Sequence, residues 1–362
     1  MSKSRYGFST LLSQEENKRL LLRDAQDGAL SHALLFTGPT GSGRRSLAMA
    51  LAAYLLCEDP GAEDACGICP SCRYVEGGTH PDLKELNSPD GKLIKVEMVR
   101  DAIIRDLPHM PQLSRCKVYI LAADYLNEQG QNALLKSLEE PPAYAYFILT
   151  AESASELLPT IISRVREYKL QPLTESEMRE VLKREGYTEG LDFLAAYGGH
   201  IPGRALALAA REDYAELRKT SLDLISTLAD QSFLDLAAKS QRWLLDHKEE
   251  FADFLAIGQS YLRDLGLMIW QQKQHKQQAD NLSLLNPDQK KRLQAQARLL
   301  SGPLEFLTDE ALAELLDCVA QAEALLREAE EALNYNVNYE ILTWNLLLGL
   351  KEYLRPVKIG KL

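Results

Sequence analysis

The chain has 362 residues, of which 46% are hydrophobic and 26% charged, and its formal net charge is -11 at pH 7. This length allows roughly two or three domains, and the acidic balance argues against a chain that binds nucleic acid alone, because such binding depends on Lys and Arg. The longest apolar runs, such as residues 47–57, fall short of the ~20 residues of a membrane span, and the amino terminus lacks an apolar signal core. We therefore expect a cytoplasmic protein that does not contact a membrane.

The first 170 residues alternate helical patterns with short apolar runs. Such runs, separated by helices, are typical of strands in a parallel sheet that is covered on both faces. The sequence therefore predicts an α/β domain over residues 1–170. Its strands are expected at residues 33–37, 82–86, 118–121 and 146–150.

A glycine-rich loop, GPTGSGRRS, runs from Gly38 to Ser46 between the first predicted strand and an apolar helix. This context is that of a loop that binds phosphate through backbone N–H groups at a helix start. The functional pattern ends in Gly-Lys-Ser/Thr, whereas here Arg44 and Arg45 follow Gly43. Ser46 comes one residue late, a rotation of about 100° along a helix, so its hydroxyl is expected to point away from a magnesium position. The residues expected to line the loop are Gly38, Gly41, Gly43, Arg44, Arg45 and Ser46.

A second part of such a site is also altered. Magnesium and the attacking water need acidic residues at the end of a neighbouring strand, but the run at 117–121 is followed by Ala122, Ala123 and a lone Asp124. These two changes predict a non-catalytic descendant of an ATPase. The alternative is an enzyme that tolerates Arg in the Lys position. Binding of ATP or ADP to the loop is left open.

Four cysteines have the spacing C-x8-C-x2-C-x2-C on a loop rich in Gly, Pro and Asp. In a reducing compartment this pattern favours a closed, structural Zn²⁺ site over disulfides. The alternatives are an iron–sulfur cluster, a redox pair or unrelated buried thiols. The expected ligands are Cys57, Cys66, Cys69 and Cys72.

The chain reads as helical from residue 171 on. Thr174 and Glu177 form a capping box, Gly198 and Gly199 end the next helix, and Pro202 is placed to start a third. The sequence therefore predicts a three-helix lid over 171–212 and an all-α domain over 213–362. In the latter, Leu312, Leu315, Val319, Ala322 and Leu326 have helical spacing.

The order of these features is specific enough to indicate a family. The degenerate loop, the cysteine insertion, NALLKSLEEPP at 132–142, FILTAES at 147–153 and IISRVREYKL at 161–170 follow one another. This order resembles the AAA+ subunits of the bacterial DNA polymerase III sliding-clamp loader, and among them the delta-prime type, up to about residue 210. The resemblance implies a RecA-like AAA+ domain, a lid and a helical collar that oligomerises. It also implies gamma/tau ATPase subunits and delta as partners, with the sliding clamp and primer-template DNA contacted through the assembled complex.

Two arginines take their expected roles from this resemblance. Ser163-Arg164-Val165 matches the family's Ser-Arg-Cys motif with Val in place of Cys, which implies that Arg164 is an arginine finger acting on a neighbour's γ-phosphate. From the residues alone, Arg164 is a surface arginine that follows a strand. Arg204 matches the lid arginine that senses nucleotide, and the other interpretation is a structural brace. Glu139 and Glu140 are expected to form a solvated helix end.

Three functions follow from these observations. The first is a non-hydrolysing clamp-loader subunit in DNA replication, without activity alone, that donates Arg164 in trans and scaffolds the ring. The second is a weakly active, ATP-hydrolysing subunit of the gamma/tau type. The third, a zinc-dependent nucleic-acid adaptor, is disfavoured by the acidic balance.

Overall fold

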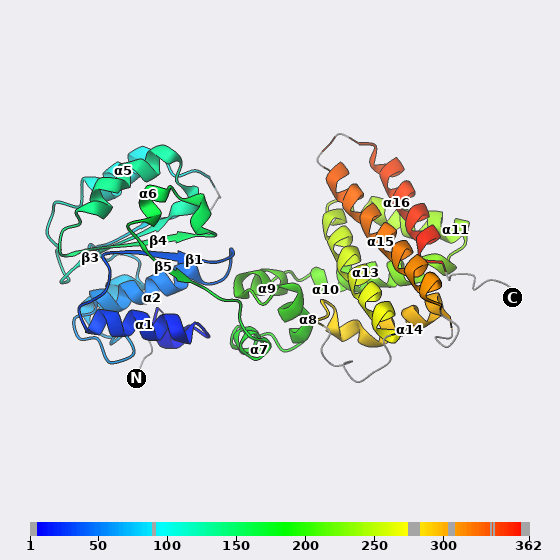
Figure 1. The fold of residues 1–362 in the computed structure, drawn as a ribbon, viewed down its shortest axis with the longest axis horizontal. Coiled ribbons are helices and arrows are strands. Elements are labelled where there is room, and N and C mark those ends of the chain that lie inside the picture. Colours follow the sequence, from blue (N-terminus) through cyan, green and yellow to red (C-terminus); the bar gives the residue numbers. More distant parts are fainter. Residues whose placement is uncertain are drawn as a thin grey trace. The chain divides into compact units, whose positions relative to one another are not determined.

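The computed structural model describes residues 6–88, 92–273, 283–302, 308–333, 335 and 337–355 (Figure 1). Contacts divide them into two compact units: residues up to Glu185 with His200–Arg204, and Gly186–Gly199 with the residues from Ala205 on. The first unit contains η1 (Phe8–Thr10), α1 (Glu15–Gln26), β1 (Ala33–Thr37), α2 (Arg44–Leu56), α3 (Pro70–Glu76), β2 (Leu83–Leu86), α4 (Val96–Val99), η2 (Arg100–Ile104), β3 (Lys117–Ala122), η3 (Ala123–Tyr125), α5 (Glu128–Glu139), β4 (Ala145–Ala151), η4 (Ala154–Glu156), α6 (Pro159–Ile162), β5 (Arg166–Lys169) and α7 (Glu175–Arg184).

The second unit is helical in its described residues. Helix α9 (Pro202–Ala209) begins in the first unit and continues in the second. The other elements are α8 (Leu191–Tyr197), α10 (Tyr214–Thr227), η5 (Leu228–Asp230), α11 (Phe233–Asp235), η6 (Leu236–Gln241), α12 (Arg242–Asp246), α13 (Phe251–Lys273), η7 (Pro287–Gln289), α14 (Lys290–Ser301), α15 (Asp309–Ala332) and α16 (Tyr339–Tyr353).

The sheet of the first unit has the strand order β2-β3-β4-β1-β5, and every paired strand is parallel. This confirms the predicted RecA-like α/β domain, including strands at all four expected positions. The fifth strand, β5, was not predicted. Of its four residues only Tyr168 is buried, and charged side chains occupy the other positions. Such a pattern is common on an edge strand, where charges discourage pairing with other chains.

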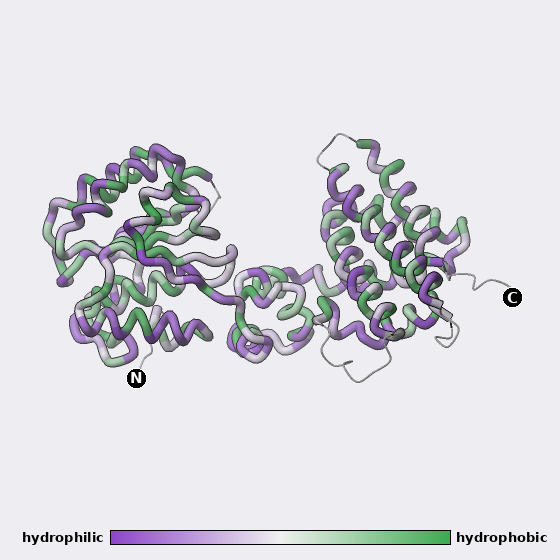
Figure 2. Tube along the Cα trace, in the orientation of Figure 1, coloured by the Kyte–Doolittle hydropathy of each residue, from purple (hydrophilic) through white to green (hydrophobic). Residues whose placement is uncertain are grey.

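Two hydrophobic cores lie on the two faces of this sheet. Successive strand residues point to opposite faces, so Leu34 and Phe36 pack toward α1 and α2, and Leu35 packs toward α5 and α6. Figure 1 shows these helix pairs on the two sides of the sheet. In Figure 2 hydrophobic residues dominate α2, whereas hydrophilic residues alternate with them along α1. The sheet is therefore a rigid support for the loops at its edges.

In the second unit, α13 packs against α10, α14 and α15, and α15 packs against α16. Four of the residues predicted on one helical face, Leu315, Val319, Ala322 and Leu326, are buried along α15, while Leu312 is partly exposed. Parts of the predicted all-α segment, 274–282, 303–307 and 356–362, lie outside the described residues. Within the described ranges, no helix is both long and apolar enough to cross a membrane.

The three helix boundaries predicted after residue 170 are confirmed. The Thr174 hydroxyl accepts from the Glu177 N–H at 3.3 Å, and the Glu177 carboxylate accepts from the Thr174 N–H at 2.7 Å, which closes the capping box of α7. Helix α8 ends before Gly198, and α9 begins at Pro202. Because contacts assign α7 to the first unit and α8 to the second, the domain boundaries at 170 and 212 stay a prediction.

The start of α9 touches the glycine-rich loop so closely that it requires glycine. The Gly203 N–H donates to the Gly41 carbonyl at 2.9 Å, and a Cβ on Gly203 would meet the Gly41 Cα at 2.7 Å. We expect Gly203→Ala to lower the free energy of unfolding by about 1–3 kcal/mol, the usual effect of overpacking. Thermal or urea unfolding measures the effect. Gly266→Ala is the control, since its Cβ would meet only Val319 at 3.6 Å; equal losses in the two variants would contradict the prediction.

Candidate functional site

The glycine-rich loop follows β1 at the carboxyl edge of the sheet. Its first amide, Gly38 N–H, bonds to the carbonyls of Ala151 at 3.3 Å and Glu152 at 3.2 Å beyond β4. Gly43 has φ +96° and precedes the first residue of α2, a left-handed conformation that glycine adopts without strain. The loop thus retains the backbone shape of an anion-binding site at a helix start.

The side chain in the lysine position is neutralised from within the domain. Arg44 Nη1 lies 3.2 Å from Asp124 Oδ2, and each side chain is 12% exposed. Asp124 lies in η3, which directly follows β3. This lone acid therefore pairs with Arg44, the residue that stands where the functional pattern has a lysine. Burial raises the pKa of Asp124, and the charge of Arg44 offsets part of that rise.

The neighbouring charges are paired in the same way. Arg45 forms an ion pair with Glu85 of β2. The Thr40 hydroxyl donates to Glu152, which lowers the pKa of that carboxyl, and the charges of Arg44 and Arg204 act in the same direction. Arg204 is exposed on α9. The residues at this end of the loop therefore do not fit magnesium-assisted hydrolysis, which needs an available cation and an acidic pair.

The other end of the loop is open. A cavity of about 160 Å³ lies beside it, lined by residues that include Leu12, Ser42, Ser46, Leu173 and Pro202. Ser46 is exposed and lines this cavity, while Arg44 faces Asp124. The Ser42 hydroxyl is buried and has no hydrogen-bond partner among the described residues. Ser42 and Ser46 therefore line the cavity, whereas Arg44 contacts Asp124 at the other end of the loop.

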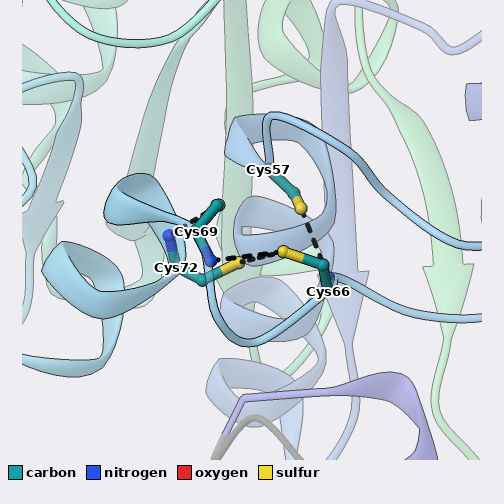
Figure 3. A group of neighbouring side chains, drawn as sticks. All are labelled: Cys57, Cys66, Cys69 and Cys72. Atoms are coloured by element: carbon teal, nitrogen blue, oxygen red, sulfur yellow. Dashed lines mark hydrogen bonds between the residues drawn. The ribbon is translucent and has the colours of Figure 1, made fainter.

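The four predicted cysteines converge at the far end of α2 (Figure 3). Cys57 directly follows α2, Cys69 directly precedes α3, and Cys72 lies in the first turn of α3. All four sulfur atoms lie within 4.8 Å of one another, and the Cys66 and Cys72 sulfurs are 3.9 Å apart. Four thiolates around a tetrahedral Zn²⁺, at 2.3 Å each, would be about 3.8 Å apart. The cluster therefore fits a four-coordinate metal ion, and all four positions come from the protein.

The thiols are arranged to accept hydrogen bonds. Cys57 Sγ accepts from the Cys66 N–H at 3.3 Å, and Cys66 Sγ accepts from the Cys69 N–H at 3.4 Å. Burial raises the pKa of Cys57 and of Cys72. Burial also opposes charge on Cys66, but the backbone N–H groups of Ile68 and Cys69, together with the thiols of Cys57 and Cys69, outweigh it and lower its pKa to about 7. A bound cation would favour the thiolate forms that bind it.

A buried polar network behind α3 was not predicted from the sequence. His80 Nδ1 accepts from the Asp82 N–H at 3.1 Å, so Nε2 carries the proton and lies 2.8 Å from the Ser71 hydroxyl. The hydroxyls of Ser71 and Ser114 both donate to the Leu56 carbonyl, at 2.6 and 2.9 Å. Burial lowers the pKa of His80, which keeps the ring neutral. The network ties the cysteine-bearing helix to the end of α2.

Arg164 lies elsewhere in the domain. The residues-only interpretation, an arginine after a strand, was wrong: Arg164 follows the short helix α6 and precedes β5. Its Nη1 donates to the Thr160 carbonyl at 2.6 Å and to the Ser163 hydroxyl at 3.0 Å, and Nη2 forms an ion pair with Glu139. Glu139 is exposed at the end of α5, as predicted for a solvated helix end, and its carboxylate in addition forms this ion pair. Glu140 is exposed.

Comparisons with known proteins were consistent with these features. The family described as "DNA polymerase III, delta subunit" matches residues 13–174. DNA polymerase III subunit delta' of Haemophilus influenzae is 37% identical over 197 residues, which cover 54% of this chain and 60% of that protein. Subunit delta' of Bacillus subtilis is 29% identical over 335 residues, covering 92% of this chain and 95% of that one.

Among solved structures, a DNA polymerase III gamma subunit-related protein from Thermotoga maritima aligns with a TM-score of 0.42 and 20% identity. The alignment covers 94% of this chain and 99% of that one. The chain thus spans about 60% of the Haemophilus relative's length and nearly all of the Bacillus relative's. The matched family model and these relatives together show that the chain is similar to delta' subunits of DNA polymerase III.

Proposed function

We propose that the protein is a delta-prime-type subunit of the sliding-clamp loader of DNA polymerase III and works in the cytoplasm during DNA replication. In this proposal it does not hydrolyse ATP itself, and it donates Arg164 in trans to the ATP site of a neighbouring gamma/tau-type subunit. Residues 1–170 form the AAA+ domain, 171–212 the lid, and 213–362 the collar that holds the ring. Delta, the clamp and primer-template DNA are met through the assembled complex.

One observation carries the non-hydrolysing role: the ion pair between Arg44 and Asp124. The guanidinium that replaces the lysine is bound to the acid that would face magnesium. Each of these groups is consequently committed to the other, and neither is available to triphosphate or metal. A magnesium-bound ATP would have to separate a pair that is mostly shielded from water, where opposite charges attract more strongly.

The topology supports action in trans. The strands are parallel, the glycine-rich loop follows β1, and Arg164 lies two residues before the start of β5, the neighbour of β1. The loop therefore lies at the carboxyl ends of the strands and Arg164 at their amino ends, separated by a strand length of about 15 Å. Arg164 is thus directed away from its own loop, as an arginine that serves a neighbouring subunit would be. There it would stabilise charge on the γ-phosphate.

The cavity beside Ser42 and Ser46 favours a second candidate, a weakly active subunit of the gamma/tau type that still binds nucleotide. The two candidates differ in turnover by the isolated chain.

For the cysteine cluster we propose structural Zn²⁺, held by Cys57, Cys66, Cys69 and Cys72. The sulfur spacing supports a tetrahedral ion. Because a site with four protein ligands leaves no open position for water, the metal would contribute to folding rather than to catalysis.

Arg164→Ala should slow ATP hydrolysis by the assembled loader with clamp and DNA by at least about tenfold. This is less than the 10³–10⁵ of a single-site arginine finger, because the chain serves one site of the ring. Steady-state turnover and gel filtration of the assembled loader measure the two relevant properties. Arg105→Ala is the control, because this exposed arginine forms an ion pair with Asp101, four residues earlier. Unchanged turnover with Arg164→Ala would remove the assignment.

The isolated chain should not hydrolyse ATP. Asp124→Asn frees Arg44, so it should tighten binding of labelled ATP by about fivefold or more, as expected for roughly 1 kcal/mol, and should not create turnover. Filter binding and phosphate release measure these properties. Turnover by the unaltered chain that Asp124→Asn abolishes would instead support the gamma/tau-type candidate.

Freshly purified protein should contain about one zinc per chain, and Cys69→Ser should release it. Loss of the metal should lower the unfolding midpoint by more than about 5 °C, which corresponds to roughly 2 kcal/mol in a domain of this size. Elemental analysis and thermal unfolding measure both effects. Cys318→Ser, outside the cluster, should retain the metal; iron in place of zinc, or no metal in the unaltered protein, would overturn the proposal.

A further inference from the structure

An arginine that acts in another subunit's site must present its guanidinium across an interface. A free arginine side chain has rotamer entropy of about 2 kcal/mol, which is lost when it is fixed in one geometry. A side chain that is already held in place loses less on binding. The contacts of Arg164 are therefore informative about how such a residue is prepared.

Three groups hold the guanidinium of Arg164. The Thr160 carbonyl and the Ser163 hydroxyl both accept from Nη1, at 2.6 and 3.0 Å, and both belong to the segment that carries Arg164. The third group, the Glu139 carboxylate, accepts from Nη2 and comes from a different helix. Glu139 therefore determines where the guanidinium lies relative to the rest of the domain.

Glu139 itself is placed by a rigid element. It is the last residue of α5, a helix anchored in the core by Leu134 and Leu138, and Pro141 and Pro142 follow after Glu140. The carboxylate of a residue in the last turn of a helix opposes the helix dipole. Helix stability consequently does not explain a Glu at this position, whereas the contact with Arg164 does.

The guanidinium still has donors to offer. It carries five N–H groups, and the contacts above use two on Nη1 and one on Nη2. Nε–H and the second Nη2–H form no hydrogen bond to any part of the chain that the structure describes, and the side chain is 32% exposed. These two donors suit a pair of phosphate oxygens.

We infer that Glu139 is a positioning residue for Arg164: its carboxylate orients the guanidinium so that the remaining N–H groups face a neighbouring subunit. This inference rests on the proposed role of Arg164 in trans. It assigns different roles to two adjacent acids, because Glu140 is exposed and forms no ion pair within the described residues.

The test uses the assembled loader with clamp and DNA, carrying Glu139→Ala, Glu139→Gln, Glu140→Ala, Arg164→Ala or the double variant Glu139→Ala/Arg164→Ala. Because the pair is partly exposed, Glu139→Ala should lower kcat by about two- to fivefold, with KM for ATP unchanged. Glu139→Gln keeps an oxygen acceptor and should restore part of the rate, and it gives a second measurement if alanine loosens the end of α5. Glu140→Ala should match the unaltered loader. The double variant should match Arg164→Ala, since Glu139 acts through Arg164.

The outcomes separate this inference from the proposed function. If Arg164→Ala slows hydrolysis and Glu139→Ala does not, the positioning role is overturned and the proposed function stands. If Glu139→Ala still slows an Arg164→Ala loader, or accelerates the unaltered one, Glu139 is respectively structural or restraining, and the inference is again overturned. If Arg164→Ala has no effect, the proposed function itself fails.

Discussion

The ion pair between Arg44 and Asp124 is the interaction on which the candidate site depends. A helix start lined by backbone N–H groups attracts negative charge, and an unpaired arginine beside it would be repelled by the same dipole. Asp124 supplies the negative charge from within the domain, at 3.2 Å from Arg44. Removing one member of such a shielded pair leaves the other uncompensated, which is far less favourable than the pair itself. Arg44 in the lysine position and the lone Asp124 after β3 are therefore coupled, and either one alone would leave an unmatched charge in the loop.

Helix α2 connects this loop to the cysteine cluster. It begins directly after Gly43 and ends directly before Cys57, a span of about 20 Å at the usual rise per residue. Its alanines and leucines are buried against the sheet along most of that length. The His80 network then connects the cysteine-bearing helix α3 to the carbonyl of Leu56. The cluster thus lies at the end of the helix away from the glycine-rich loop, where the proposed metal would stabilise the fold.

Much of this architecture could be predicted from local pattern. Strands β1, β3 and β4 are continuous apolar runs, and the capping box of α7 lies within four adjacent residues. Strand β5 was missed because its residues are mostly charged and exposed. The pairings of Arg44 with Asp124 and of Arg164 with Glu139 join residues 80 and 25 positions apart. Sequence reasoning singled out all four of these residues but assigned their partners to other molecules or to solvent, because only the folded sheet brings them together.

Arg164 and the glycine-rich loop lie at opposite ends of the strands of one sheet, so the two ends of this sheet carry different functional groups. In a head-to-tail assembly each subunit uses one surface to contact the next subunit and a different surface to contact the previous one. On the proposed function, this chain would donate Arg164 to one neighbour. It would not use an arginine from its other neighbour, because Arg44 of its own loop is already paired with Asp124. Such a subunit terminates a series rather than extending it. A ring that includes it would have a defined first and last position, and so a built-in place to open.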